Sequence, residues 1–350
     1  MKSTSSGATS SMQRVSLKDI ADELGISQTA VSFAINDRPG VSAETKRRVK
    51  EAAAKMGWRP IYAAQALGSS KTMTVGFAPS RSVQGLKEET FMLHFMAGAH
   101  ESLSRQRYGL LYRPCSSTKE ELDVYRDWAS RKRVDGVILV DLKADDPRPK
   151  LLAELGLPAV LAGGPDPSNL VPSLSIDDSK TMGTILDHLL SRGYRRIAYI
   201  SGDPMLDYSR DREMSFRKFA EINNLEFSSV SFTNFDPNAA VGETLRLLGE
   251  LAAPTAFIYE NEILAAASLH ALAADCLNRD RKGSDGDKRL YPYSIPAIVS
   301  FEDSFVCEAV YPSITSVHRD AGVYGTKVAN LLLKVLAGAV SYTHLTLPTN

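Results

Sequence analysis

The chain has 350 residues, of which 43% are hydrophobic and 23% charged, a composition typical of a soluble globular protein with two or three domains. Three widely separated cysteines exclude a disulfide framework or a cysteine-rich zinc site, and with no visible signal peptide or membrane span we expect a cytoplasmic protein. The net charge is zero, but residues 1–72 hold 11 basic and 6 acidic residues, an excess of +5 that favours a nucleic-acid-binding head on a body of net charge −5.

A small helical domain is predicted at residues 14–60, after a Ser-rich leader at residues 1–13 that we expect to be disordered. Ser16, with Asp19 three residues later, has the spacing of a capping box and opens a first helix, LKDIADEL. Gly25 ends this helix, because glycine adopts the left-handed backbone conformation that terminates helices.

Two further helices follow at short intervals. Ser27 caps a second helix at residues 28–36, and Ser42 caps a third that ends at Gly57. Two helices joined by a three-residue turn containing glycine form a helix-turn-helix, whose second helix enters the DNA major groove; the alternative is a purely structural three-helix bundle. With Val31, Ala34 and Ile35 facing the core, the outward residues are Gln28, Thr29, Ser32, Phe33 and Asn36.

The body of the chain alternates strand-like runs with helical segments. Residues 61–72 form a linker of marginal helical strength that can become helical when it docks. From residue 73 to 339, runs such as TVGFA, DGVILV, RIAYIS and PTAFIYE alternate with amphipathic segments, which predicts parallel sheets with crossover helices. This length favours two facing α/β lobes that bind a small ligand at the carboxyl ends of their strands. We expect lobe 1 at about residues 73–165 and 319–339 and lobe 2 at about residues 166–318.

The head sequence VSLKDIADELGISQTAVSFAINDRPGVSAETKRRVKEAAAKMGWRP resembles the DNA-binding head of the lactose-repressor (LacI/GalR) family almost without a gap. RVDGVIL, HLLSRGYRRIAYISG, PTAFIYEN and PSITSV extend this resemblance more loosely to about residue 339. The resemblance implies an all-α helix-turn-helix head joined to a two-lobed α/β effector domain of the periplasmic-binding-protein-like (type I) class. It also implies a homodimeric transcriptional regulator, most simply a repressor, that binds a palindromic operator and a small-molecule effector such as a sugar.

The family pattern also implies which residues touch DNA. Gln28 and Thr29 match positions that read base edges, and Leu67 matches the leucine that wedges between central base steps. At Phe33 the family often has Arg, which reads guanine, so we predict a half-site that lacks this guanine. One or two of the basic residues Lys46, Arg47, Arg48 and Lys50 are expected to reach phosphates. The complete implied DNA-binding set is Ser27, Gln28, Thr29, Ser32, Phe33, Asn36, Tyr62, Ala64 and Leu67.

The positions that match the family's effector pocket are Phe91, Asp177, Arg212, Asn261 and Glu302. Arg212 is the strongest candidate, because a guanidinium binds hydroxyls or carboxylates through a planar fork. Asp177 follows a strand and has the alternative role of a helix cap. Asn261-Glu262 replaces the usual Asn-Asp pair, and Glu302 replaces an Asp, so the family's typical sugar contacts do not carry over directly.

The sequence also distinguishes a regulator from two other classes of protein. A two-lobed sugar-binding transport protein would share the body, but the head and the absence of a signal peptide argue against it. An enzyme would need a catalytic motif, and the chain contains no GxSxG, GxxxxGK[ST], HExxH or GxGxxG sequence. We therefore expect no enzymatic activity, no metal and no cofactor.

The last residues, 340–350, break the family pattern. VSYTHLTLPTN stands where the family has a loop and a final strand that crosses back to lobe 2. It resembles translated read-through of a sequencing adaptor, with a divergent short terminus as the alternative. We therefore expect a non-native tail and an exposed strand edge in lobe 2.

Overall fold

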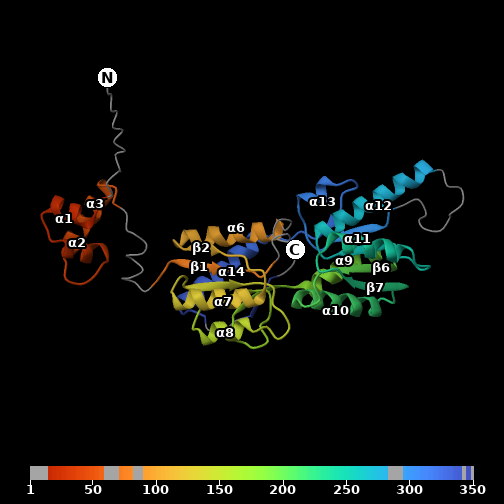
Figure 1. Ribbon diagram of the computed structural model, residues 1–350, viewed down its shortest axis with the longest axis horizontal. Coiled ribbons are helices and arrows are strands. Elements are labelled where there is room, and N and C mark those ends of the chain that lie inside the picture. The colour runs from red at the N-terminus through yellow and green to blue at the C-terminus, as the bar shows by residue number, and fades with distance from the viewer. Residues whose placement is uncertain (1–14, 59–70, 82–89, 283–294, 341–343, 348–350) are drawn as a thin grey trace, which may run out of the picture. The chain divides into compact units, whose positions relative to one another are not determined.

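In a computed structural model, residues 15–58, 71–81, 90–282, 295–340 and 344–347 are described, and the chain divides into two compact units, Met1–Thr72 and Met73–Asn350 (Figure 1). No helix in these ranges is both long and apolar enough to cross a membrane.

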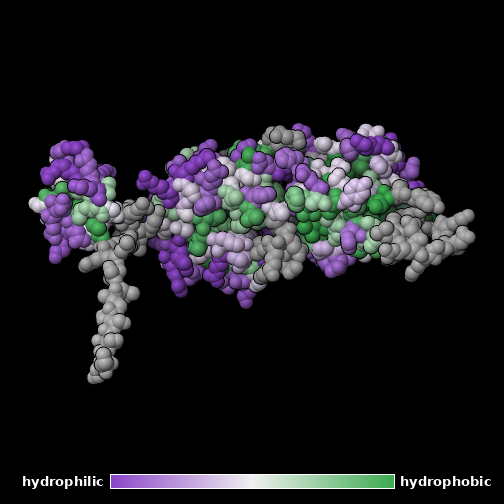
Figure 2. Space-filling model, turned by 90° about the horizontal axis from the view of Figure 1, so that it is seen from above, coloured by the Kyte–Doolittle hydropathy of each residue, from purple (hydrophilic) through white to green (hydrophobic). Residues whose placement is uncertain are grey.

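Unit 1 contains the predicted three helices, α1 (Leu17–Leu24), α2 (Gln28–Ile35) and α3 (Ala43–Lys55). Their starts are confirmed, because Ser16, Ser27 and Ser42 each accept a backbone hydrogen bond from the first turn, and Ser16 forms the expected capping box with Asp19. Gly25 ends α1 in the left-handed conformation, with φ 63°. The buried core is Ile20, Ala21, Val31, Ala34, Val49 and Ala53. Hydrophilic side chains dominate the surface of this unit in Figure 2, as expected when three helices enclose their apolar faces.

Unit 2 contains two parallel sheets. The first has the strand order β11-β5-β4-β3-β1-β2, and the second has the order β10-β9-β8-β6-β7. The first sheet comprises β1 (Thr74–Phe77), β2 (Gly109–Tyr112), β3 (Gly136–Leu139), β4 (Ala159–Ala162), β5 (Ser173–Ile176) and β11 (His344–Leu347). The second comprises β6 (Arg196–Ser201), β7 (Phe227–Phe232), β8 (Ala256–Tyr259), β9 (Ala297–Ser300) and β10 (Thr315–Ser316).

Helices cover both faces of each sheet, so the central strands are buried on both sides. On the first sheet, α6 (Thr90–Arg105) and α14 (Ala321–Leu336) pack on one face, and α7 (Thr118–Ser130) and α8 (Arg148–Glu154) on the other (Figure 1). On the second, α9 (Asp178–Ser191) and α10 (Asp207–Ile222) pack on one face, opposite α11 (Pro237–Leu248), α12 (Glu262–Lys282) and α13 (Phe305–Ala309). The two-lobed α/β class predicted from the sequence is confirmed.

The predicted lobe boundary near residue 165 is wrong. Strand β5 pairs in parallel with β4, through Leu161 with Ser173 and Ala162 with Leu174, and therefore belongs to the first sheet. The chain crosses to lobe 2 only after Ile176, where α9 begins. Pairing between strands is a tertiary feature, which the spacing of apolar residues alone does not reveal.

The C-terminal segment contributes to lobe 1. Residues 344–347 form β11, which pairs in parallel with β5 at the edge of the first sheet. The Oγ of Ser173 lies 2.8 Å from Nδ1 of His344 across this pair. The origin of VSYTHLTLPTN and the open edge expected in lobe 2 stay predictions.

Candidate functional site

Helix α2 is held in unit 1 so that its N-terminal end faces solvent. The Oγ of Ser27 accepts a hydrogen bond of 3.1 Å from the amide of Ala30, which fixes the first turn. Val31 and Ala34 are completely buried, and they anchor the opposite side of the helix in the core. As a result Gln28 and Thr29 are exposed, as is Asn36 at the far end.

Phe33 is less outward than the sequence predicts. Both Ser32 and Phe33 are half-buried. Gly40, in the loop before α3, has φ 109°, and a Cβ atom at this position would lie 3.4 Å from Cδ2 of Phe33. The Phe33 ring therefore packs partly against this loop and leaves its remaining surface for a partner.

Intramolecular ion pairs occupy three of the four basic residues of α3 that are expected to reach phosphates. Lys46 and Lys50 both contact the carboxylate of Asp37, at 3.5 and 3.0 Å. Arg47 lies between two glutamates of its own helix, at 2.6 and 2.8 Å. Arg48 is exposed and has no ion-pair partner within residues 15–58, so it is the residue of this group most available to a phosphate. The hinge residues Tyr62, Ala64 and Leu67 lie outside the described residues.

Unit 2 contains a cavity of about 590 Å³ whose walls come from both lobes. Lobe 1 supplies side chains from α6 and from the carboxyl ends of β3, β4 and β5, as predicted for parallel sheets. Its residues include Arg81, Phe91, Phe95, Asp141, Leu142 and Tyr324, and β11 adds His344 and Thr346. The lining residues from lobe 2 and from the segments that join the lobes include Asp177, Asp178, Asp207, Tyr208, Asp211, Arg212, Lys218, Glu302 and Arg319.

Four of the five predicted effector residues line this cavity, namely Phe91, Asp177, Arg212 and Glu302. Asp177 also has its alternative role, because its Oδ1 accepts a 2.8 Å hydrogen bond from the amide of Lys180 and caps α9. Asn261 is not among the lining residues. Its Oδ1 instead accepts a 3.0 Å hydrogen bond from the amide of Leu264 in the first turn of α12.

The guanidinium of Arg212 is buried among aromatic and acidic groups. Its Nη1 donates to Oε1 of Glu260 at 2.7 Å, and its Nε lies 3.2 Å from Oδ2 of Asp178. The rings of Phe301 and Tyr208 lie 4.3 and 5.0 Å from its Cζ. Burial alone would lower the pKa of Arg212, but the carboxylates of Asp178 and Glu260 outweigh it and raise this pKa well above its usual value.

The sequence alone does not identify the residues that hold Arg212. Glu260 is 1% exposed and accepts hydrogen bonds from Tyr199, from Ser201 at 3.0 Å and from Ser209 at 3.3 Å. Asp178 also pairs with Arg319, from the segment before α14. One signal for Glu260 was present: it is a charged residue directly after a buried strand, PTAFIYE.

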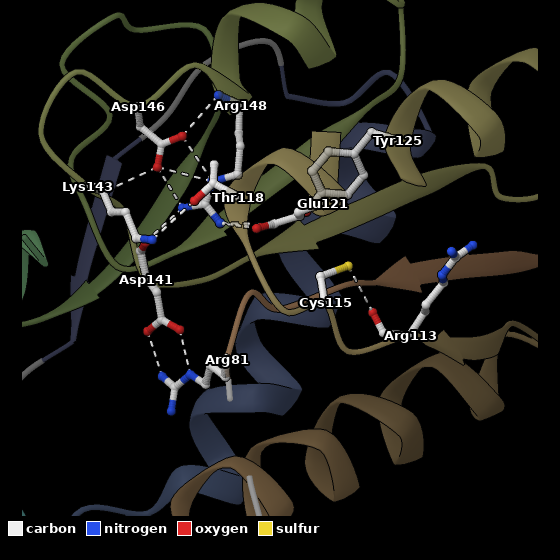
Figure 3. A network of polar contacts seen from close by, with 10 residues as sticks. All are labelled: Arg81, Arg113, Cys115, Thr118, Glu121, Tyr125, Asp141, Lys143, Asp146 and Arg148. Carbon is white, nitrogen blue, oxygen red and sulfur yellow. Dashed lines mark hydrogen bonds and ion pairs between the residues drawn. The ribbon is translucent and has the colours of Figure 1, made fainter. Parts of the chain in front are cut away.

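A second polar network holds the lobe 1 wall in place (Figure 3). Arg81 and Asp141 form a two-bond ion pair at 2.5 and 2.6 Å beside the cavity. Arg148, 1% exposed, donates from Nη2 to the carbonyl of Asp141 at 2.7 Å and pairs with Glu121 and Asp146. Burial opposes ionisation of Asp146, but its hydrogen bonds with Arg148 outweigh this and keep its pKa below the usual value.

The loop that contains Asp141 also connects the two lobes. The carbonyl of Leu142 accepts a 2.9 Å hydrogen bond from the amide of Asp207, the first residue of α10. Lys143 and Leu206 form an isolated antiparallel bridge next to it. A ligand that contacts Asp141 or Leu142 would therefore act directly on a contact between the lobes.

The side chains that line this cavity are suited to a hydroxylated ligand. Guanidinium and carboxylate groups can donate and accept hydrogen bonds with hydroxyls, and aromatic rings can pack against apolar C–H faces. Among the described residues, no group of three or more His, Cys, Asp or Glu side chains is arranged to hold a metal ion.

Comparison with known proteins identifies the relatives of both units. Residues 16–60 match the family described as bacterial regulatory proteins, lacI family, and residues 186–278 match the periplasmic binding protein-like domain. The regulator CelR of Thermobifida fusca is 28% identical over 330 residues, which cover 93% of each chain. The regulator AglR of Rhizobium meliloti strain 1021 is 31% identical over 264 residues, covering 74% of this chain and 73% of AglR.

Solved structures agree with this relationship. The CelR–cellobiose complex superimposes with a TM-score of 0.70 at 27% identity and covers 96% of this chain and 98% of its own. The lac repressor dimer bound to operator and an anti-inducer gives a TM-score of 0.75 at 19% identity, over 95% of this chain and 97% of that one. At that identity the second match supports the fold alone.

Proposed function

Because the chain belongs to the lacI family of bacterial regulatory proteins, we propose that it is a transcriptional repressor that binds an operator as a homodimer and releases or retains it according to a bound small molecule. Its close relatives are transcriptional regulators. We propose that it acts by binding alone, without catalysis, and in the cytoplasm, where chromosomal DNA is accessible.

One observation carries this proposal. A single chain joins a helix-turn-helix with exposed Gln28 and Thr29 to a polar cavity of about 590 Å³. A transport protein has no use for the first of these parts, and a constitutive DNA-binding protein has no use for the second.

In this mechanism two copies of α2 enter successive major grooves of a near-palindrome. Gln28 and Thr29 contact base edges, and a good two-bond contact contributes about 1–3 kcal/mol of discrimination. Ser27, Ser32, Phe33 and Asn36 line the same side of the helix or its ends. Phe33 covers apolar base edges such as a thymine methyl. Tyr62, Ala64 and Leu67 act in the hinge, with Leu67 as the wedge between base steps.

The effector binds in the cavity of unit 2, against Phe91, Asp177, Arg212 and Glu302. The CelR structure contains cellobiose, and we propose that the ligand of this chain is likewise a carbohydrate. Its binding changes the contact between the Leu142 carbonyl and the start of α10 and thereby the relation of the lobes. A coupling of about 1–3 kcal/mol between the two sites is typical of such proteins.

The test is selection of duplex DNA from a random library by the full-length chain. We expect a palindromic consensus whose affinity falls steeply with salt. Gln28→Ala should weaken binding to this consensus and relax one symmetric pair of positions. The matched control Gln106→Ala, at an exposed site in unit 2, should change neither. Selection of no palindrome, or of the same one with equal affinity by Gln28→Ala, would refute the proposal.

A further inference from the structure

Three of the four basic residues of the cavity are paired with the protein's own carboxylates. The cavity contains four basic side chains, Arg81, Arg212, Lys218 and Arg319. Arg81 is held by Asp141 through two short bonds, and the two side chains are only 18% and 10% exposed. This pair offers no free positive charge to a ligand.

Arg212 and Arg319 form a second, deeper group with two acidic partners. Both guanidiniums contact Asp178, and Arg212 also donates to Glu260 at 2.7 Å. The side chains of Arg212, Arg319 and Glu260 are 4%, 5% and 1% exposed. Two positive charges therefore meet two negative charges among buried side chains, where charges interact more strongly than in water.

Glu260 contacts Arg212 but is not itself a residue that lines the cavity. Its carboxylate also accepts from Tyr199, Ser201 and Ser209, so its position is fixed from several sides. It removes the net charge of Arg212 while the guanidinium, which has five N–H donors, keeps some for the cavity. Arg212 is in this way a donor for hydroxyl oxygens without being an unpaired cation.

Acidic side chains outnumber basic ones in the lining, with six carboxylates against four basic residues. Asp141 and Asp178 belong to the ion pairs above, and Asp207 pairs with Arg210 at 2.6 Å. Asp177, Asp211 and Glu302 are the further carboxylates of the lining. Burial raises the pKa of Asp211, and the neighbouring carboxylates of Asp207 and Asp178 raise it further, as a negative local potential would. Lys218 is on the exposed side of α10. An anionic ligand would lose its hydration here and gain no unpaired buried cation in return.

We propose that the cavity selects an uncharged polyhydroxylated ligand over its phosphorylated or carboxylated analogues, and that Glu260 sets this preference by neutralising Arg212. The inference rests on the proposed function of the cavity as the effector site. It adds a specificity-determining residue that has no direct contact with the ligand.

The experiment measures binding of matched neutral and anionic sugars to the full-length chain by calorimetry. The probes are glucose with glucuronate and glucose 6-phosphate, and cellobiose with cellobionate. We expect the neutral member of a pair to bind at least about tenfold more tightly than its anionic partners. Equal or tighter binding of an anionic member would overturn the proposal. It would leave the proposed function standing, since that depends on duplex selection.

The role of Glu260 is tested with Glu260→Gln, which keeps the size of the side chain and removes its charge. Arg212 and Arg319 would then share one carboxylate, so the anionic member should gain at least about tenfold relative to the neutral one. Glu243→Gln is the matched control, because Glu243 pairs with Arg246 on α11, away from the cavity. An unchanged ratio in Glu260→Gln would refute the role of Glu260. The comparison on the unmodified chain decides the charge preference even where the variant folds poorly.

Discussion

Helices α6 and α14 cross so closely that their glycines are required. A Cβ atom at Gly98 would lie 1.9 Å from the carbonyl oxygen of Gly322, and one at Gly325 would lie 2.0 Å from that of Phe95. The hydroxyl of Thr326 donates to the carbonyl of Gly98 at 3.1 Å across the same contact. Since α6 carries Phe91 and α14 follows Arg319, this crossing also supports the cavity wall.

Gly98→Ala should therefore destabilise unit 2. The added methyl group meets a backbone oxygen, which cannot rotate away as a side chain can, so the helices must separate by roughly 1 Å. Overpacking of this kind costs about 1–3 kcal/mol. The higher helix propensity of alanine returns up to about 1 kcal/mol. We expect a net loss of about 1–2 kcal/mol in the free energy of unfolding.

The assay is urea unfolding followed by circular dichroism and by tryptophan fluorescence, to which Trp128, buried in lobe 1, and Trp58 of unit 1 both contribute. The control is Gly242→Ala in α11, where no described atom lies within 4 Å of the new Cβ. There only propensity acts, so the same substitution should raise stability by about 0.5–1 kcal/mol. A Gly98→Ala protein as stable as the unmodified chain would refute the reasoning.

Three further predictions follow from individual contacts. Ser27→Ala removes the cap of α2 and should lower the stability of unit 1 by about 1 kcal/mol in thermal melts and weaken duplex binding; unchanged values would show that the cap is redundant. Arg148→Met leaves the buried carboxylates of Glu121 and Asp146 unpaired and should cost about 3–5 kcal/mol in urea unfolding, with a loss below about 1 kcal/mol contradicting the buried network. Burial raises the pKa of the Cys115 thiol to about 11, so the native chain should resist iodoacetamide at pH 8 in peptide mapping, whereas labelling within minutes would disprove this burial.

Local features were predictable from the sequence because local contacts produce them. The caps at Ser16, Ser27 and Ser42 depend on residues three positions away, and the structure has all three. The strand–helix alternation of the body depends on periodicity within short windows, and it gave the correct class of fold.

Features that depend on distant residues were not predictable in this way. The group around Arg212 brings together Asp178, Glu260 and Arg319, and the hydrogen-bonded pairs within it are 34 to 141 positions apart in the chain. The position of β5 in the first sheet depends on pairing with β4 rather than on its own composition. Asn261 accepts a hydrogen bond from the first turn of α12, so its side chain has a local partner and does not line the cavity.

The most direct test of the account is the affinity of the full-length chain for its selected operator, measured by fluorescence anisotropy with and without a ligand. The ligand is the neutral sugar that most raises the thermal stability of the chain. The account predicts that saturation with this sugar changes the operator Kd by about 5- to 150-fold, because the cavity and the helix-turn-helix are coupled by about 1–3 kcal/mol. A sugar that binds the chain and leaves the operator Kd unchanged would contradict the central claim.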